Sequence, residues 1–324
     1  MSIKYYLVSL LLLLVLSVAH LCIGDIALDL SVVWERQENV QSIVFHELRL
    51  PRLLLVLLVG SALGMAGAAM QGLLRNPLAD PSLLGVSSAA ALGAVLTLYY
   101  GFASLAWFVL PVAGVIGGVL ATALVFLLAG VTQQTISLIL AGVAINALMS
   151  SGIALALNFA PNPYAMTEMV HWMLGSFANR SMRDLYFALP FIVVGMVLLL
   201  TQLKLLRALS LGDSVAQTLG IALQRRRTLA IVAIALMVGA SVSICGSIGF
   251  IGLVVPHLMR PLVKYDPARL LSASAISGAA FLLLADIVVK ILSAAQELKI
   301  GVVTSLVGAP FFLAMILSVR KRGG

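Results

Sequence analysis

The chain has 324 residues, of which 62% are hydrophobic and only 10% are charged, with a formal net charge of +8. Soluble domains carry about 25% charged residues, so this composition excludes an ordinary soluble fold and predicts an all-α protein that crosses a membrane many times. Residues 81–167 contain no Asp, Glu, Lys, Arg or His, which leaves little room for an extramembrane domain.

Apolar runs of helical length follow one another and predict a single membrane domain, residues 1–324, with about ten spans. The first run follows Lys4 and looks like a secretory signal, but it is longer than the usual apolar core and lacks a clear cleavage site. We therefore expect a retained span there. The predicted spans are 5–24, 53–74, 83–99, 105–129, 135–159, 185–203, 228–246, 248–260, 269–290 and 301–319. The break Gly246-Ser247-Ile248-Gly249 is expected to turn the chain before a short eighth helix.

The positive charges predict the orientation in the membrane. Lys and Arg are concentrated between the sixth and seventh spans, between the eighth and ninth, and at the C-terminus. With ten spans these segments share one side, which the positive-inside rule identifies as the cytoplasm, together with both termini. The basic charge thus indicates topology, and we predict no binding to nucleic acid, because that would need a basic extramembrane surface.

Few ionisable residues lie inside the predicted spans. Asp286 and Lys290 are four residues apart, on one helix face, where they can pair. His20 and His257 have no further His, Cys or carboxylate at ligand spacing, so packed or solvated histidines are expected and no metal site is predicted. Ionisable groups inside a span are functional candidates by default.

An internal echo links two parts of the chain. In both, glycines lead to an arginine and then to an Asp-Pro turn, and the glycines and arginines are separated by 185 residues. The matching positions are Gly64, Gly67, Arg75 and Asp80 with Gly249, Gly252, Arg260 and Asp266. Transporters are often built from repeats, so the echo is consistent with duplication and equally with two independent occurrences.

The gap between the sixth and seventh spans, about residues 205–227, contains a candidate helix. Gly212 breaks the backbone, Asp213 or Ser214 can cap the helix that follows, and Gly220 can end it. The apolar residues at helical spacing on one face are Val215, Ala216 and Leu219. Such a helix could lie on the membrane surface or dock a protein, and the lack of a basic face favours docking.

Some chemistry is excluded by missing motifs. The sequence has no G-x-x-x-x-G-K-[ST] phosphate loop and no arguable catalytic set, so the chain is predicted not to be an enzyme. A self-contained, ion-driven carrier usually shows carboxylates in mid-span, where Asp286 is the sole candidate. A transporter driven by a partner remains the favoured interpretation, with a secondary carrier or channel and a structural membrane protein as alternatives.

Several long motifs occur in a fixed order. They are RLPR at 49–52, NPLADPSLLG at 76–85, LAGVAIN at 140–146, HWMLGSF at 171–177, LSLGDSVAQTLG at 209–220, GSIGFIGLVVPHLMR at 246–260 and ELKIGVVTSLVGAPFF at 297–312. With these motifs the chain resembles the FecCD-type permeases over nearly its whole length. Those are the membrane subunits of bacterial ABC importers for iron chelates, haem and vitamin B12.

The resemblance implies a multi-pass subunit of the bacterial inner membrane, surrounded by lipid, that works as a homodimer or with a similar permease. Two cytoplasmic ATPases beneath it would hold ATP and Mg, with no cofactor in this chain, and a periplasmic binding protein would deliver substrate. An iron–siderophore or haem is the expected cargo, with vitamin B12 as the alternative. Specificity is expected mainly in the binding protein.

The resemblance also implies roles for individual residues. Arg49 and Arg52 match motif arginines that engage the binding protein, and Lys290 occupies a third basic position, as a departure from the family arginine. Thr135 and Ile136 fall at the cytoplasmic gate, where Ile136 replaces a small polar residue of the vitamin B12 member. The segment at about 205–227 is matched to a short pair of cytoplasmic coupling helices, and the residues matched to ATPase coupling are Leu209, Leu211, Gly212, Asp213, Ala216, Leu219 and Gly220.

Overall fold

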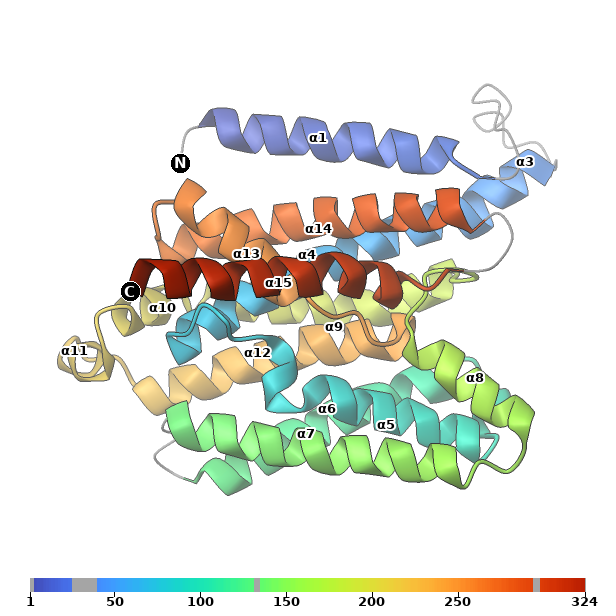
Figure 1. The fold of residues 1–324 in the computed structure, drawn as a ribbon, viewed down its shortest axis with the longest axis horizontal. Coiled ribbons are helices and arrows are strands. Elements are labelled where there is room, and N and C mark those ends of the chain that lie inside the picture. The colour runs from blue at the N-terminus through green and yellow to red at the C-terminus, as the bar shows by residue number, and fades with distance from the viewer. Residues whose placement is uncertain (1–2, 25–39, 131–134, 294–297, 324) are drawn as a thin grey trace.

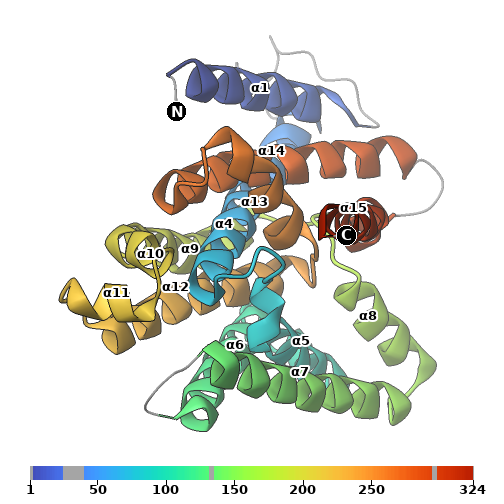
Figure 2. The ribbon, with the colours of Figure 1, turned by 60° about the vertical axis from the view of Figure 1, so that its left-hand side comes forward.

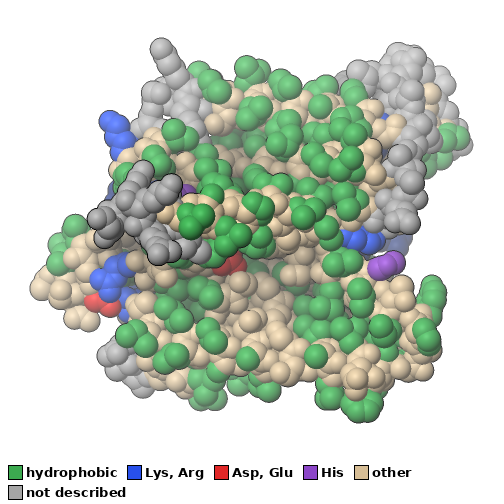
Figure 3. All heavy atoms as spheres, viewed as in Figure 1, with side chains coloured by type: hydrophobic (Ala, Val, Ile, Leu, Met, Phe, Trp, Pro, Cys, Tyr) green, Lys and Arg blue, Asp and Glu red, His purple; other side chains and the backbone are tan. Residues whose placement is uncertain are grey.

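The computed structural model describes residues 3–24, 40–130, 135–293 and 298–323. Within these ranges every element of regular structure is a helix, as the sequence predicts. The long helices lie side by side with α4 in the middle, α1 at one edge and α5, α6 and α7 at the other (Figures 1 and 2). Hydrophobic side chains are spread over the face seen in Figure 3, between the two ends of the bundle.

The apolar helices follow the predicted spans closely. They are α1 (Ile3–Cys22), α4 (Leu50–Leu74), α5 (Val86–Tyr99), α6 (Val109–Ala129), α7 (Thr135–Asn158), α9 (Met182–Leu200), α12 (Leu223–Cys245), α13 (Ile251–Leu262), α14 (Pro267–Leu292) and α15 (Ile300–Gly323). Among the described residues, six helical stretches are long and apolar enough to cross a membrane, and four shorter apolar helices accompany them. The chain is therefore a polytopic helical protein, and the count of ten spans stays a prediction.

Short helices join these elements. They are α3 (Val40–Ile43), the π-helix η1 (Val44–Arg49), the 3-10 helices η2 (Pro81–Leu84) and η3 (Phe102–Ser104), α8 (Pro163–Met173), α10 (Leu203–Leu209) and α11 (Asp213–Thr218). The sequence interpretation had no helix at α8. Asn162 begins it by accepting a hydrogen bond from the Ala165 N–H at 2.8 Å, and Pro163 suits its first turn.

Glycines allow the central helices to approach closely. A Cβ on Gly64 would overlap the backbone of Ser274 in α14, and one on Gly67 would overlap the backbone of Gly252 in α13. Small residues of this kind are what lets membrane helices pack with their backbones in contact. Gly67 and Gly252 are matching positions of the 185-residue echo, so the two echoed segments touch directly.

The start of α1 and the end of α15 lie at the same end of the bundle. The labels N and C, together with α10 and α11, gather there in Figure 1, while α3 and α8 lie at the opposite end. This grouping agrees with the sequence-based topology, in which both termini and the α10–α11 segment share one side. We call this the α11 end, and the opposite one the α3 end.

Candidate functional sites at the two ends of the bundle

At the α3 end, Asp286 of α14 is the centre of a buried cluster. Arg52 of α4 donates two hydrogen bonds to it, from Nε to Oδ2 and from Nη2 to Oδ1, each at 2.8 Å. His20 of α1 places Nε2 2.7 Å from Oδ2. The Asp286 and His20 side chains are fully buried, and the Arg52 side chain is 18% exposed. The paired geometry is the strong, two-pronged form of an Arg–carboxylate contact.

Two further basic residues complete this cluster around the end of α1. Lys290 donates from Nζ to the His20 carbonyl oxygen at 2.8 Å. Arg49 donates from Nη1 to the Leu21 carbonyl at 2.6 Å and is itself 6% exposed. The last carbonyls of a helix have no partners within it and favour cations. These residues therefore fasten α1 to α4 and α14.

The structure thus brings together the three residues matched to binding-protein docking: Arg49, Arg52 and Lys290. It buries them more deeply than an exposed docking patch would require. The sequence also allowed Asp286 and Lys290 to pair, but within the described residues Asp286 pairs with Arg52 and His20 instead. His20 was missed as a member of the cluster, because its partner Asp286 is 266 residues away in sequence.

At the α11 end, Asp213 joins the short helix to two long ones. Its carboxylate lies 2.9 Å from Arg227 Nη2 of α12 through either oxygen, and its Oδ1 lies 3.2 Å from Arg75 Nη2 at the end of α4. The sequence suggested Asp213 or Ser214 as the helix cap. The structure instead places Gly212 there with φ +112°, so the Asp213 carboxylate is available for the arginines.

The residues matched to ATPase coupling divide into two sets. Leu209 and Ala216 are fully buried and anchor α10 and α11, whereas Leu211 and Leu219 are 67% and 62% exposed. Gly220, with φ +72°, ends α11 by donating its N–H to the Gln217 carbonyl, as the sequence predicts. The structure therefore confirms the helix, but the predicted apolar face is divided, because Ala216 is buried while Val215 and Leu219 are exposed, and the role in coupling remains a prediction.

A second ion pair holds the base of α14 at this end. Asp266 accepts from the Ala268 N–H at 2.9 Å and from Arg207 through both oxygens at 3.3 Å. Burial raises the pKa of the Asp266 carboxyl, but the hydrogen bonds from Arg207 and the backbone outweigh it and hold the pKa below its ordinary value. Asp266 is therefore ionised at neutral pH.

The residues matched to the gate lie at the beginning of α7. Thr135 is the first residue of this helix, and the Ile136 side chain is 71% exposed. The turn that precedes them, 131–134, lies outside the described residues. The structure thus places the apolar side chain of Ile136 on the exposed surface of the chain.

Nearly the whole chain can be matched to a known protein family. A model of the FecCD transport family matches residues 11–318. The chain belongs to the FecCD transport family. This confirms the resemblance inferred from the motifs, and it makes the protein a multi-pass transport permease and not an enzyme.

Relatives of this FecCD permease span most of its length. An uncharacterized ABC transporter permease, YvrB, of Bacillus subtilis is 41% identical over 286 residues, covering 87% of this chain and 80% of the relative. The vitamin B12 import permease BtuC of Escherichia coli O9:H4 is 39% identical over 275 residues, with 85% and 84% covered. The hemin transport permease HmuU of Yersinia pestis is 36% identical over 318 residues, with 97% and 95% covered.

A solved structure has the same fold as this FecCD permease. It is an inward-facing conformation of a metal-chelate type ABC transporter, with a TM-score of 0.89 and 34% sequence identity. The match covers 97% of this chain and 99% of that chain. The helix arrangement described above is therefore shared with a chain of that ABC transporter.

Proposed function

We propose that this chain is the permease of a binding-protein-dependent ABC importer, which moves an iron chelate, a siderophore complex or haem, inward across the bacterial inner membrane by ATP-driven alternating access. The observation that carries this proposal is α11. Leu211, just before this helix, and Leu219, just after it, are exposed, while Asp213 ties the helix to α4 and α12. Exposed leucines on both sides of a helix that ion pairs hold to the bundle offer a partner protein an apolar surface in a fixed position.

In this proposal, two cytoplasmic ATPases bind ATP and Mg, and they contact the exposed side of α11. Asp213 transmits their movement to Arg227, whose side chain is only 4% exposed within α12, and to Arg75 at the end of α4. Because both arginines share one carboxylate, α4 and α12 would move with α11 as one unit. The movement of the ATPases as they close would thus be transmitted to the core of the bundle through these ion pairs and not through a flexible linker.

The substrate path is proposed to run along the face that carries α7 and α15. A cavity of about 630 Å³ opens there between the end of α8 and α15, with Leu174, Val302, Leu306 and Pro310 in its wall. Leu140 of α7 and Leu306 of α15 are 64% and 69% exposed. A second copy of the chain would cover this apolar face, with Ile136 at the proposed gate, and a largely apolar wall would let bulky chelates pass.

The α3 end is the proposed docking site for a periplasmic binding protein. The cluster itself holds three basic residues, Arg49, Arg52 and Lys290, and one carboxylate, Asp286, so basic groups outnumber acidic ones within it. Acidic side chains on the binding protein would complement this excess. Exposed ion pairs contribute about 0–1 kcal/mol each, so several would have to act together.

Reconstitution tests the function. The permease and its ATPase are placed in liposomes with loaded binding protein outside and ATP inside, while ionophores collapse all ion gradients. Uptake that requires ATP supports the proposal. Uptake that follows an ion gradient without ATP would instead establish a secondary carrier.

The cargo is decided in the same liposomes by comparing a ferric siderophore, haem and vitamin B12. Vitamin B12 is the second candidate because BtuC, a vitamin B12 permease, is 39% identical to this chain. Transport of vitamin B12 alone would move the assignment to that cargo.

A further inference from the structure

Exposed aromatic side chains gather where α5 ends and where α6 and α9 begin. They are Tyr100, Phe102, Trp107, Phe108 and Tyr186, each between 45% and 64% exposed. We call these five residues the aromatic surface. Exposed apolar groups that lie together commonly mark a contact with a protein or a membrane. Neither the proposed coupling nor the proposed docking uses this surface.

Contacts between rings join the three helices at this surface. Trp107, just before α6, packs edge to face against Phe187 of α9, with ring centroids 6.4 Å apart and an interplanar angle of 86°. Tyr100, which follows α5, stacks on Phe102 of η3 at 5.6 Å and 24°. Such paired rings attract each other, and η3 itself packs on α6. The ends of α5, α6 and α9 are therefore held together at one level of the bundle.

The lengths of α6 and α9 place this level at a boundary of the membrane. The two helices have 21 and 19 residues, or about 31 and 28 Å at 1.5 Å per residue. Both values match a hydrocarbon core about 30 Å thick. Helix α9 leads directly into α10 at the α11 end, so it begins at the α3 end (Figure 1). The aromatic surface therefore lies between hydrocarbon and headgroups at the α3 end.

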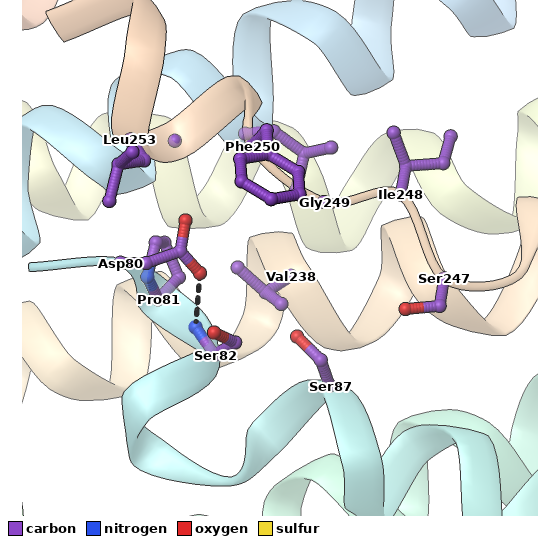
Figure 4. Close-up of a pocket in the computed structure, with 12 residues that line it drawn as sticks. Asp80, Pro81, Ser82, Ser87, Val238, Ser247, Ile248, Gly249, Phe250 and Leu253 are labelled. Carbon is purple, nitrogen blue, oxygen red and sulfur yellow. Dashed lines mark hydrogen bonds between the residues drawn. The ribbon is translucent and has the colours of Figure 1, made fainter. Parts of the chain in front are cut away.

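Helix α5 gives a second measure of this depth. It follows η2, which lies inside the bundle, where Figure 4 shows Asp80 and Pro81 beside the unwound segment before α13. A Cβ on Gly85, at the start of α5, would lie 2.9 Å from Ile145, near the middle of α7. From there the 14 residues of α5 rise about 21 Å, which exceeds half of a 30 Å core. The end of α5, with Tyr100, therefore reaches the same boundary.

An arginine stands at the head of the exposed side of α9. Residues three and four apart share one side of a helix, and the exposed positions of α9 follow that spacing. In chain order they are Arg183, Tyr186, Leu189, Pro190, Val193, Val194, Val197 and Leu200. The exposed side of α9 thus begins with a cation, continues with a tyrosine and is apolar for the rest of its length.

Arg183 has no acidic partner within the part of the chain that the structure describes. None of the ion pairs found there includes it. The neighbouring carboxylate of Asp184 is used in the cap of α9, where it accepts from the Ser181 N–H at 2.8 Å and from the Ser181 hydroxyl at 3.0 Å. The guanidinium of Arg183 is therefore open to an anion from outside the chain.

The order of groups along this surface matches the order of groups in a phospholipid. Arginine binds phosphate through paired hydrogen bonds, and tyrosine and tryptophan favour the headgroup level of a bilayer. Arg183 is four residues before Phe187, which separates their Cβ atoms by about 6 Å, and Phe187 contacts Trp107. One lipid can therefore reach the guanidinium with its phosphate and the rings with its glycerol and acyl chains.

We propose that this surface binds one anionic phospholipid of the leaflet at the α3 end, with its phosphate on Arg183 and its glycerol and upper acyl chains against Trp107, Tyr186 and Phe187. Charge selects an anionic lipid, because a zwitterionic lipid brings its own cation to compete for the phosphate. Free phosphate would contact Arg183 but would leave the rings uncovered.

This lipid site is separate from the face proposed for a second copy of the chain. Helix α9 packs on α12 and α4, whereas α15 packs on α14 and α13. Figure 2 shows α9 and α15 on opposite sides of α4. A dimer formed through α7 and α15 would therefore leave the exposed side of α9 in contact with lipid.

The test uses Trp107 as a fluorescent probe in the full-length chain. Trp34→Phe with Trp172→Phe leaves it as the one indole. The variant is placed in phosphatidylcholine nanodiscs in which a minor fraction of lipid carries quenching bromines, as phosphatidylglycerol or as phosphatidylcholine. We expect brominated phosphatidylglycerol to quench Trp107 more strongly, and bromines near the ester end of the chain to quench more than those near the methyl end. Equal quenching by the two headgroups, or quenching only from the methyl end, would overturn the proposal.

A charge variant tests the role of Arg183. Arg183→Gln is expected to weaken the association of phosphatidylglycerol about fivefold, which is the contribution of one basic group beside an anionic lipid surface. Arg225→Gln, which removes an exposed arginine at the start of α12, is the matched control and should keep the preference for phosphatidylglycerol. A preference that survives Arg183→Gln would overturn the assignment of this residue.

Inorganic phosphate, added at constant ionic strength, distinguishes a lipid from a free anion. It should leave the preference for phosphatidylglycerol unchanged, and its displacement of that lipid would assign Arg183 to free phosphate instead. Where the variant without Trp34 and Trp172 does not fold, the difference in quenching between wild type and Trp107→Phe gives the same signal. No ATPase, binding protein or cargo is present, so the result is separate from the proposed transport function.

Discussion

Arg227 Nη2 lies 2.9 Å from both carboxylate oxygens of Asp213, a contact that fixes α11 to the buried side of α12. The same carboxylate also holds Arg75 at the end of α4, at 3.2 Å. One acidic residue therefore connects the exposed helix to two helices of the core. If a partner ATPase moves α11, the ion pairs of Asp213 transmit that movement to α12 and α4.

Asp213→Asn is expected to separate ATP hydrolysis from transport. The amide keeps the size of the side chain but loses the charge that holds Arg227 and Arg75, so α11 can move without moving the core. We expect uptake to fall about tenfold or more while ATPase activity of the assembled complex stays near wild type. Ser214→Ala, at the exposed neighbouring position, serves as the control and should transport normally. Equal loss of uptake and hydrolysis would contradict this role.

Gly212→Pro is expected to uncouple the complex by distorting the entry to α11. Gly212 has φ +112°, which proline cannot adopt because its ring holds φ near −65°. The measurements are co-purification of the ATPase and uptake in liposomes. Gly101→Pro is the control, because Gly101 also has a positive φ, of +70°, but lies in open space before η3. Normal uptake with normal ATPase stoichiometry in Gly212→Pro would refute the coupling role.

Arg49→Glu combined with Arg52→Glu is expected to weaken binding-protein docking. Reversing two charges removes the positive excess at the α3 end, and we expect Kd for the loaded binding protein to rise at least about tenfold, equivalent to about 1.4 kcal/mol. Basal ATPase activity per assembled complex should be unchanged, and the thermal midpoint is measured alongside, because Arg52→Glu also removes the buried partner of Asp286. Binding can be measured by surface plasmon resonance on immobilised complex. An unchanged Kd for the loaded binding protein would contradict the assignment of this site to docking.

Asp286→Asn provides the control for that experiment and a prediction of its own. It disturbs the same cluster without reversing any charge, so affinity for the binding protein should stay close to wild type. It also leaves Arg52 partly buried without its partner, and breaking a buried ion pair costs about 3–5 kcal/mol. We expect a lower thermal midpoint and a more easily released α1, detected by limited proteolysis. A midpoint equal to that of wild type would show that the cluster adds no stability.

Much of the fold could be predicted because the beginning and end of each helix are marked by residues close together in the sequence. The fifth span was predicted at 135–159, and α7 is Thr135–Asn158, since an apolar run between turn residues marks both ends. The break before the eighth span was likewise predicted at 246–249. There α12 ends at Cys245, Gly246 has φ +72°, and α13 begins at Ile251.

Other features escaped prediction because their causes are not local. The sequence marks 76–81 as a turn at a span end, but the structure folds that segment back so that Asp80 meets Gly252 near the middle of α4. Helix α8 was missed because it lies in a segment interrupted by Pro161 and Pro163, which hides a short amphipathic helix.

The sequence by itself determined that this protein is a polytopic membrane permease of the FecCD type, because apolar length, positive-charge placement and ordered motifs are properties of the linear chain. Tertiary structure alone decided what the charged residues do. Arg52 and Asp286 are 234 residues apart in sequence, and their pairing depends on α4 and α14 packing closely through glycines. In a membrane interior each buried charge must find its partner in space, and only the folded bundle specifies which one it finds.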